Sequence, residues 1–357
     1  MTPLAKLIEA EIALTGPMPV ARFMALALGH PEHGYYMRAE PFGRGGDFIT
    51  APEISQMFGE LLGLWCANTW LRMGQPNPVH LVELGPGRGA MMADALRATA
   101  RVPGFATARQ VHLVESSPRL RLQQQAALAG HDVTWHASLD GVPAGPMLLL
   151  ANEFFDALPI RQFVRLRDGW HERMVGRSPT GEGLAFTAAP DALPLDHPLA
   201  GRAPEGSIIE TCPGGTALAA AVGERLERGG GAALIIDYGF DKPQAGATFQ
   251  AVRGHRRQDP LLEPGEADLT AHVDFAALSV AAGVTSHGPI GQGDLLRALG
   301  IGERAATLAG KATPTQAESI ASALARLTEP AAMGTLFRAM ALTGSDLEAP
   351  AGFAEAV

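Results

Sequence analysis

Residues 79–90 read VHLVELGPGRGA, and this stretch decides the fold that we expect for the chain. An apolar run of strand length ends at Glu83 and breaks into a glycine-rich turn, after which a helical pattern begins. Glycine has no Cβ, so the backbone can turn sharply and lie against a ligand, while the free N–H groups of the helix face an anionic group. Adenosine-bearing ligands bind at such turns.

The spacing of the turn fits two cofactor classes. Gly85-x-Gly87-x-x-Ala90 satisfies the fingerprint of nicotinamide dinucleotide enzymes. Glu83-x-Gly85-x-Gly87-x-Gly89 satisfies the first motif of S-adenosylmethionine-dependent methyltransferases. The turn therefore predicts a nucleotide-like cofactor, and the rest of the chain must separate the two.

Strand and helix patterns alternate from residue 79 onward. Apolar runs of strand length separated by helical patterns indicate a parallel sheet that is covered on both faces. The expected strands are 79–83, 111–115, 133–136, 147–151 and 232–237, and the expected helices between them are 90–99, 118–128 and 214–228. The expected fold class is α/β, with a Rossmann-like sheet of the class I methyltransferase type.

Other segments surround this core. Residues 1–76 read as a helical region, in which the spacing of Thr50 and Glu53 predicts a capping box that starts one helix. Residues 160–207 read as a β-rich insertion that contains a hairpin with an Asp-Gly turn. Further patterns predict helices over 272–282 and 292–309 and a late strand over 334–342. The expected domains are 1–76, then 77–345 with its insertion, then a tail at 346–357.

The ends of the expected strands carry the cofactor residues, because ligands of such sheets bind outside the carboxyl ends of the strands. Glu115 ends the second strand, where a carboxylate accepts the ribose hydroxyls of an adenosine. Glu83 can attract the ammonium of a methionine moiety, which a nicotinamide cofactor lacks, and so favours S-adenosylmethionine. The complete expected set is Asp47, Phe48, Thr50, Glu83, Gly85, Pro86, Gly87, Gly89, Glu115, Ser116, Ser138, Leu139, Asn152 and Phe155.

The segment after the fourth strand, Asn152 to Pro159, carries the expected chemistry. Methyl transfer is an in-line displacement from a sulfonium, which needs a positioned nucleophile more than a metal. Asn152 offers a carbonyl acceptor, and Glu153 and Asp156 can hold a cationic acceptor beside an aromatic wall that includes Phe155. We expect Asn152, Glu153 and Asp156 to be catalytic.

The composition of the chain argues against nucleic acid, a metal ion and a membrane as partners. The formal net charge of −9 leaves no basic footprint for nucleic acid. The two cysteines, Cys66 and Cys212, stand outside any paired motif, and the histidines show no ligand spacing, so we expect no metal site. No segment approaches the apolar length of a transmembrane helix, and no targeting pattern is visible. These features predict a cytoplasmic protein that is not inserted in a membrane.

Several separated motifs together resemble the MidA family of methyltransferases. They are GDFIT at 46–50, PEISQ at 52–56, ELGPGRG at 83–89, NEFFDALP at 152–159, DYG at 237–239 and GEADLTAHVDF at 265–275. The resemblance implies a class I methyltransferase that uses S-adenosylmethionine. Its mitochondrial relatives form symmetric dimethylarginine on a subunit of the respiratory NADH dehydrogenase, complex I.

The expected function is therefore protein arginine methylation, on a complex I subunit or its bacterial equivalent. The expected partner is a protein with an exposed arginine, and a homodimer stays open. Two alternatives also stay open at this point. One is an NAD-dependent oxidoreductase, which the shared glycine pattern and Glu115 support, and the other is a cofactor-binding assembly scaffold without essential catalysis.

Overall fold

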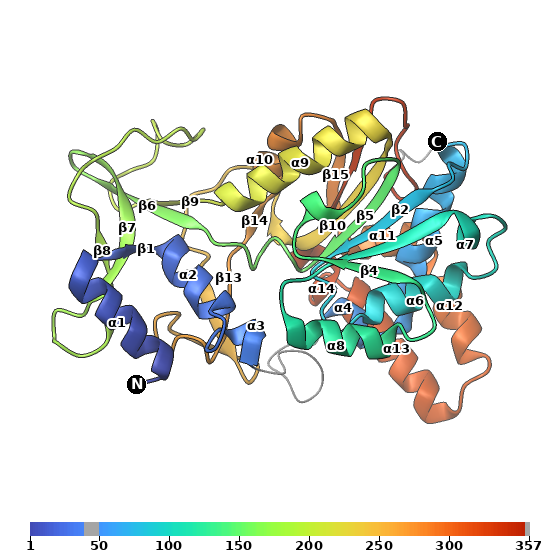
Figure 1. The fold of residues 1–357 in the computed structure, drawn as a ribbon, viewed down its shortest axis with the longest axis horizontal. Helices are drawn as coiled ribbons and strands as arrows, with labels where there is room; N and C mark the ends of the chain where they lie inside the picture. Colours follow the sequence, from blue (N-terminus) through green and yellow to red (C-terminus); the bar gives the residue numbers. More distant parts are fainter. Residues whose placement is uncertain (39–49, 354–357) are drawn as a thin grey trace. The chain divides into compact units, whose positions relative to one another are not determined.

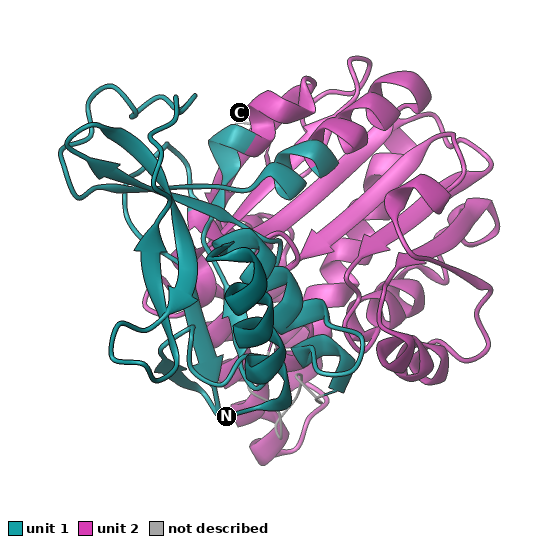
Figure 2. Cartoon of the chain, turned by 60° about the vertical axis from the view of Figure 1, so that its left-hand side comes forward, with its two compact units in different colours: residues 1–48, 156–218, 240–277 teal, residues 49–155, 219–239, 278–357 magenta. Residues whose placement is uncertain are grey.

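The computed structural model describes residues 1–38 and 50–353, and the chain divides into two compact units (Figure 2). Unit 1 comprises residues 1–48, 156–218 and 240–277, and unit 2 comprises residues 49–155, 219–239 and 278–357. Residues 1–48 of the expected N-terminal region and the whole expected insertion at 160–207 thus share one unit. The boundaries of the compact units differ from those of the expected domains, because unit 1 is assembled from three separate segments.

Unit 2 is built on a long sheet of parallel strands with one antiparallel member (Figure 1). Its order along the sheet is β15-β16-β10-β5-β2-β3-β4. The strands are β2 (Val79–Leu84), β3 (Arg109–Val114), β4 (Val133–His136), β5 (Met147–Asn152), β10 (Gly231–Phe240), β15 (Thr285–Gly291) and β16 (Phe337–Thr343). The expected Rossmann-like sheet is confirmed.

The order of the strands reverses at β2, which is the first strand of this sheet in the sequence and lies between β5 and β3 in space. Leu84 at the end of β2 is in register with Val114 on one side and with Ala151 on the other. The carboxyl ends of these three strands therefore meet at one edge. This is the switch point at which ligands of open α/β sheets bind.

Helices cover both faces of the sheet. Residues of α5 and α6 pack on one face with Leu81, Leu113 and Leu150, and α9 lies on the opposite face (Figure 1). The helices are α4 (Ala51–Ile54), α5 (Gln56–Arg72), α6 (Ala90–Thr99), α7 (Phe105–Ala108), α8 (Pro118–Ala127), α9 (Pro213–Gly229), α10 (Phe275–Ala282), α11 (Gln292–Ala298), α12 (Ile301–Ala309), α13 (Pro314–Thr328) and α14 (Met333–Leu336). Across residues 1–38 and 50–353, none of the helices has both the length and the apolar character needed to cross a bilayer.

Several expected elements are wrong in their boundaries. The expected helix over 272–282 begins only at Phe275, after the short strand β14 (Val273–Asp274), and the expected strand over 334–342 begins only at Phe337, after helix α14. The helix expected after Thr50 is broken at Ser55, whose extended backbone ends α4 and whose hydroxyl accepts a hydrogen bond from Met57 N and so caps α5. Thr50 is the N-cap of α4, but its side chain makes no capping bond, so the expected capping box does not form. The pattern over 292–309 is two helices, because Gly300 adopts a left-handed conformation between them.

Unit 1 contains the antiparallel part of the chain. One sheet has the order β1-β7-β6-β9 with β8 beside β7, and a second has the order β12-β11-β13. Its elements are α1 (Pro3–Thr15), β1 (Met18–Pro19), α2 (Val20–Gly29), α3 (Tyr35–Arg38), β6 (Arg161–Leu166), β7 (Gly169–Arg177), β8 (Leu184–Ala188), β9 (Ile208–Thr211), β11 (Gln250–Arg253), β12 (Arg256–Gln258), β13 (Asp268–Thr270) and β14 (Val273–Asp274). The expected hairpin forms, but Arg167 and Asp168 make its turn, since Gly169 already pairs with Leu166.

Three histidines on adjacent strands form a chain across unit 2. His80 Nδ1 lies 3.0 Å from His112 Nε2, and His112 Nδ1 lies 3.0 Å from His136 Nε2. His80 also hydrogen-bonds to the backbone of Ala144. Each nitrogen pair needs one donor and one acceptor, so the chain is satisfied by three neutral rings.

Burial, reinforced by the two neighbouring rings, lowers the pKa of His112 from 6.5 to about 4. The unfolded polypeptide binds a proton at His112 near pH 6.5, whereas the folded protein binds it only near pH 4. The contribution of the neutral His112 ring to stability is therefore fully present above about pH 6.5 and is lost as the pH falls toward 4. We expect a loss on the order of 2 to 3 kcal/mol from His112. Thermal denaturation between pH 7.5 and 4.5 measures it.

A pair of variants separates this effect from the titration of other groups. His112→Gln removes the titrating ring, so the decline of its melting temperature with acidification is shallower than that of the parent. His131→Gln changes an exposed histidine of the same unit and keeps the parental slope. Identical slopes for all three proteins would contradict the assignment.

Candidate functional site

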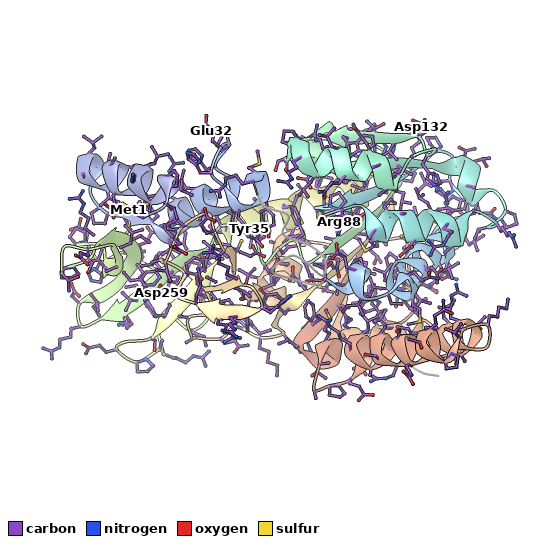
Figure 3. All side chains as sticks on the ribbon, turned by 90° about the horizontal axis from the view of Figure 1, so that it is seen from below. Met1, Glu32, Tyr35, Arg88, Asp132 and Asp259 are labelled. Atoms are coloured by element: carbon purple, nitrogen blue, oxygen red, sulfur yellow. The ribbon has the colours of Figure 1, made fainter. Side chains whose placement is uncertain are left out.

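The glycine turn joins β2 to α6 in a conformation that favours glycine. Gly85, Gly87 and Gly89 have φ angles of 59°, 52° and 84°, all in the left-handed region. A Cβ on Gly85 would lie 2.5 Å from a ring carbon of Phe154, so the ring packs directly on the turn. Arg88, labelled in Figure 3, belongs to the same turn. The turn is therefore compact and has an aromatic side chain against it.

Two buried oxygens at this edge of the sheet lack partners among the described residues. Glu83 is 2 % exposed and its Oε2 accepts no hydrogen bond from the described part of the chain. Asn152, on the adjacent strand β5, is 8 % exposed, and its Oδ1 also accepts no hydrogen bond from the described residues. Burial raises the pKa of Glu83 to about 8. Buried acceptors of this kind normally have donors, which a ligand can supply.

Glu115 follows β3, and its carboxylate accepts hydrogen bonds from the backbone of Ser116 and Ser117 and from the side chain of Gln124. Ser117 N donates to Oε1 at 2.7 Å, and Gln124 Nε2 donates to Oε2 at 3.1 Å. Burial raises the pKa of Glu115, and these hydrogen bonds oppose the increase. A carboxylate has about four lone-pair sites, so the group can still accept a further donor such as a hydroxyl.

The residues after β5 form a strained turn. Glu153 has φ of 50°, which is unusual for a residue other than glycine. Its Oε1 accepts hydrogen bonds from Ala51 N, at the start of α4, and from Asn152 Nδ2, both at 3.1 Å. Strain of this kind persists where the surrounding structure holds it, and it is concentrated at functional sites.

Asp237 of β10 holds this turn, and sequence reasoning did not assign it a role. Its Oδ2 accepts hydrogen bonds from Phe154 N at 3.1 Å and Phe155 N at 3.0 Å, and its Oδ1 accepts one from Tyr238 N at 2.9 Å. Asp237 is completely buried. Asp237 ends the fifth expected strand, and this position could have indicated a role at the site from the sequence alone.

The three residues expected to be catalytic do not all lie in one unit. Asn152 and Glu153 are hydrogen-bonded neighbours in unit 2. Asp156 is buried in unit 1, where its backbone oxygen accepts a hydrogen bond from Ala271 N. The pKa of Tyr36 is raised mainly by burial, next by the charge of Asp268 and then by the charge of Asp156.

The other expected cofactor residues are distributed around the same strand ends. Ser116 is exposed beside Glu115, and Ser138 is exposed after β4. Leu139 is buried at the start of a short 3₁₀ turn (Leu139–Gly141), and Phe155 is buried, while Phe154 faces the glycine turn. Asp47 and Phe48 lie outside the described residues.

These features fit an S-adenosylmethionine molecule. The oxygens of Glu83 and Asn152 that lack partners in the described chain could accept hydrogen bonds from an ammonium group, and Glu115 could accept one from a ribose hydroxyl. Glu53 of α4 carries a third buried oxygen, Oε2, that has no partner in the described part of the chain. The other carboxylate oxygen of Glu53, Oε1, lies 3.8 Å from Arg88 Nη1. When bound, the cofactor would supply an activated methyl group, and these residues would bind and orient it.

Comparisons with known proteins identify the family and the cofactor class. The family model of S-adenosyl-L-methionine-dependent methyltransferases matches residues 61–290, more than half of the chain. A protein arginine methyltransferase NDUFAF7 of mitochondria from Danio rerio is 37% identical and covers 93% of this chain and 85% of its own length. The protein of the same name from Homo sapiens is 36% identical and covers 96% and 83%.

A crystal structure of a Burkholderia thailandensis protein bound to S-adenosyl-homocysteine also matches. It has a TM-score of 0.83 and 30% identity, and it covers 99% of this chain and 94% of the other. These findings favour S-adenosylmethionine over the nicotinamide cofactor that the glycine pattern alone left open. The chain belongs to the family of S-adenosyl-L-methionine-dependent methyltransferases that also contains these relatives.

Proposed function

We propose that this protein transfers a methyl group from S-adenosylmethionine to an arginine side chain of a protein substrate. The observation that carries the proposal is the buried pair of acceptors, Glu83 and Asn152, beside the glycine turn and Glu153. The names of the curated relatives support arginine as the acceptor.

The chemistry of arginine explains why a carboxylate is needed at this place. The guanidinium keeps its charge near neutral pH because its pKa exceeds about 12, so its nitrogen is a poor nucleophile. A carboxylate that holds the guanidinium localises the charge away from the attacking nitrogen, and it can accept a proton as the new bond forms. We assign these roles to Glu153, with Asn152 beside it and with Asp156 as a second carboxylate.

The experiment that tests Glu153 is the substitution Glu153→Gln. The amide oxygen can still accept the hydrogen bond from Ala51 N, so the turn and the cofactor site keep their shape. We expect methyl transfer to fall at least about 100-fold, which corresponds to ~2.7 kcal/mol of barrier. We expect the dissociation constant for S-adenosylhomocysteine, measured by calorimetry, to change by less than about threefold.

Glu303→Gln is the matched control, because Glu303 is an exposed residue of α12 and its amide variant should keep the full rate. Full turnover by Glu153→Gln would remove Glu153 from the mechanism. A large loss of cofactor affinity in the same variant would instead assign it to cofactor binding.

The finer parts of the proposal are a complex I subunit as substrate, symmetric dimethylarginine as product, and a homodimer. Incubation with a labelled methyl donor and a lysate of the host, followed by mass spectrometry of the labelled band, identifies the substrate and the modified residue. Light scattering determines the mass of the assembly. Cofactor binding without any methylated product would favour the scaffold alternative.

A further inference from the structure

Gln124 of α8 joins three parts of the cofactor site, and sequence reasoning gave it no role. It is completely buried. Its Nε2 donates one hydrogen bond to Gly87 O at 2.8 Å and another to Glu115 Oε2 at 3.1 Å. Its Oε1 accepts a hydrogen bond from Trp135 Nε1, in β4, at 2.9 Å. A single amide therefore links the glycine turn, the carboxylate after β3 and the edge strand.

The orientation of this amide is unique. An indole N–H can only donate, and the carbonyl oxygen of Gly87 can only accept. A flipped amide would face Trp135 with its NH₂ group and would face Gly87 and Glu115 with its oxygen, so that every contact became unfavourable. Trp135 thus fixes the direction in which Gln124 presents its two N–H groups.

The consequence is a fixed distance between two ligand-binding elements. The glycine turn and Glu115 belong to different strand ends, which the backbone joins through the hydrogen bond from Gly85 N to Val114 O. Gln124 adds the side-chain link between Gly87 and the Glu115 carboxylate. Gly89 packs against α8 as well, since a Cβ there would lie 3.4 Å from the Cα of Gln124. Buried polar networks in which every member has a partner are rigid, which is what a preorganised binding site needs.

We propose that Gln124 is a positioning residue for the cofactor, which holds the Glu115 carboxylate where it accepts the ribose hydroxyls while the glycine turn stays in place. The inference rests on the proposed function, because it takes Glu115 as the ribose acceptor. The ribose is remote from the reacting methyl group, so Gln124 contributes equally to the ground state and the transition state. Its loss raises KM and leaves kcat nearly unchanged.

The test is the substitution Gln124→Met, which keeps the length of the side chain and removes its polar atoms. We expect the dissociation constant for S-adenosylhomocysteine and the KM for S-adenosylmethionine to rise about tenfold, with kcat within about twofold of the parent. Gln125→Met is the matched control on the exposed side of the same helix, and it should bind as the parent does.

A second ligand separates positioning from a general loss of structure. The 2′,3′-dideoxy analogue of S-adenosylhomocysteine has no ribose hydroxyls, so the contact that Gln124 supports is already missing. We expect the Gln124→Met penalty to shrink to less than about threefold for this analogue. An equal penalty for both ligands, or no penalty for either, would overturn the inference.

Trp135→Phe is the variant to use if Gln124→Met does not fold, because it removes only the donor that orients the amide. It should show a smaller penalty with the same dependence on the ribose hydroxyls, and a ligand-independent penalty would again count against Gln124. A parent protein that binds S-adenosylhomocysteine but methylates nothing would contradict the proposed function while leaving this result intact. A parent protein that does not bind it overturns both.

Discussion

Gly85→Ala is expected to abolish measurable methyl transfer and to weaken S-adenosylhomocysteine binding at least about 100-fold, or ~2.7 kcal/mol. Two costs combine at this position. The left-handed backbone at φ of 59° disfavours any residue with a Cβ, by about 1 kcal/mol or more. The new Cβ would also lie 2.5 Å from the Phe154 ring, well inside van der Waals contact.

The ring cannot yield easily. Phe154 N donates to Asp237, and the ring packs edge-on against Phe155 with centroids 5.6 Å apart. The glycine turn must therefore shift away from Phe154, and its backbone no longer lies where the cofactor would bind. Calorimetry with S-adenosylhomocysteine measures the loss.

Gly130→Ala is the matched control for this substitution. Gly130 has a φ of 88°, and a Cβ there would have nothing within 4 Å, so the variant carries the backbone cost without the collision. It should lose about 1 kcal/mol of stability and keep its cofactor affinity. Equal binding by Gly85→Ala and the parent would show that the turn does not contact the cofactor.

Asp237→Asn is expected to be the second large effect. The carboxylate receives three backbone N–H donors, two on Oδ2 and one on Oδ1. An asparagine can turn its oxygen to only one side, so its NH₂ group faces at least one N–H donor in the buried interior. Leaving such a group unsatisfied costs about 1 to 3 kcal/mol, and the loss of charge-assisted bonds adds to it.

This loss should reach the site as well as the fold. Asp237 holds the backbone of Phe154 and Phe155, directly after the strained Glu153. When that support is removed, Glu153 relaxes from φ of 50° and its carboxylate leaves Ala51. We expect a decrease of about 2 to 4 kcal/mol in the free energy of unfolding, together with a fall in kcat of at least about 100-fold.

Chemical denaturation and initial-rate assays measure the two effects. Asp294→Asn is the control, because Asp294 is an exposed partner of Arg297 in α11, and its amide variant should stay within about 0.5 kcal/mol of the parent. An Asp237→Asn protein with parental stability and rate would show that the turn after β5 does not depend on this carboxylate.

Much of the secondary structure of unit 2 could be predicted from the sequence, because the patterns that indicate it lie within short segments of the chain. The three glycines at 85–89 all adopt left-handed backbone within one short segment, and the apolar run of β5 is contiguous from Met147 to Ala151. Helix α6 matches its expected bounds for the same reason, since periodicity and a glycine start are properties of neighbouring residues.

The pairing of distant segments was decided only by the tertiary structure. β16 is inserted antiparallel between β10 and β15, and no local pattern encodes that order. Asp237 meets Phe154 across 83 residues, and Gln124 meets Gly87 across 37. A buried carboxylate or amide is satisfied by whichever donors and acceptors the fold brings to it. The sequence by itself therefore determined that a cofactor turn exists, while packing determined which side chains hold it in shape.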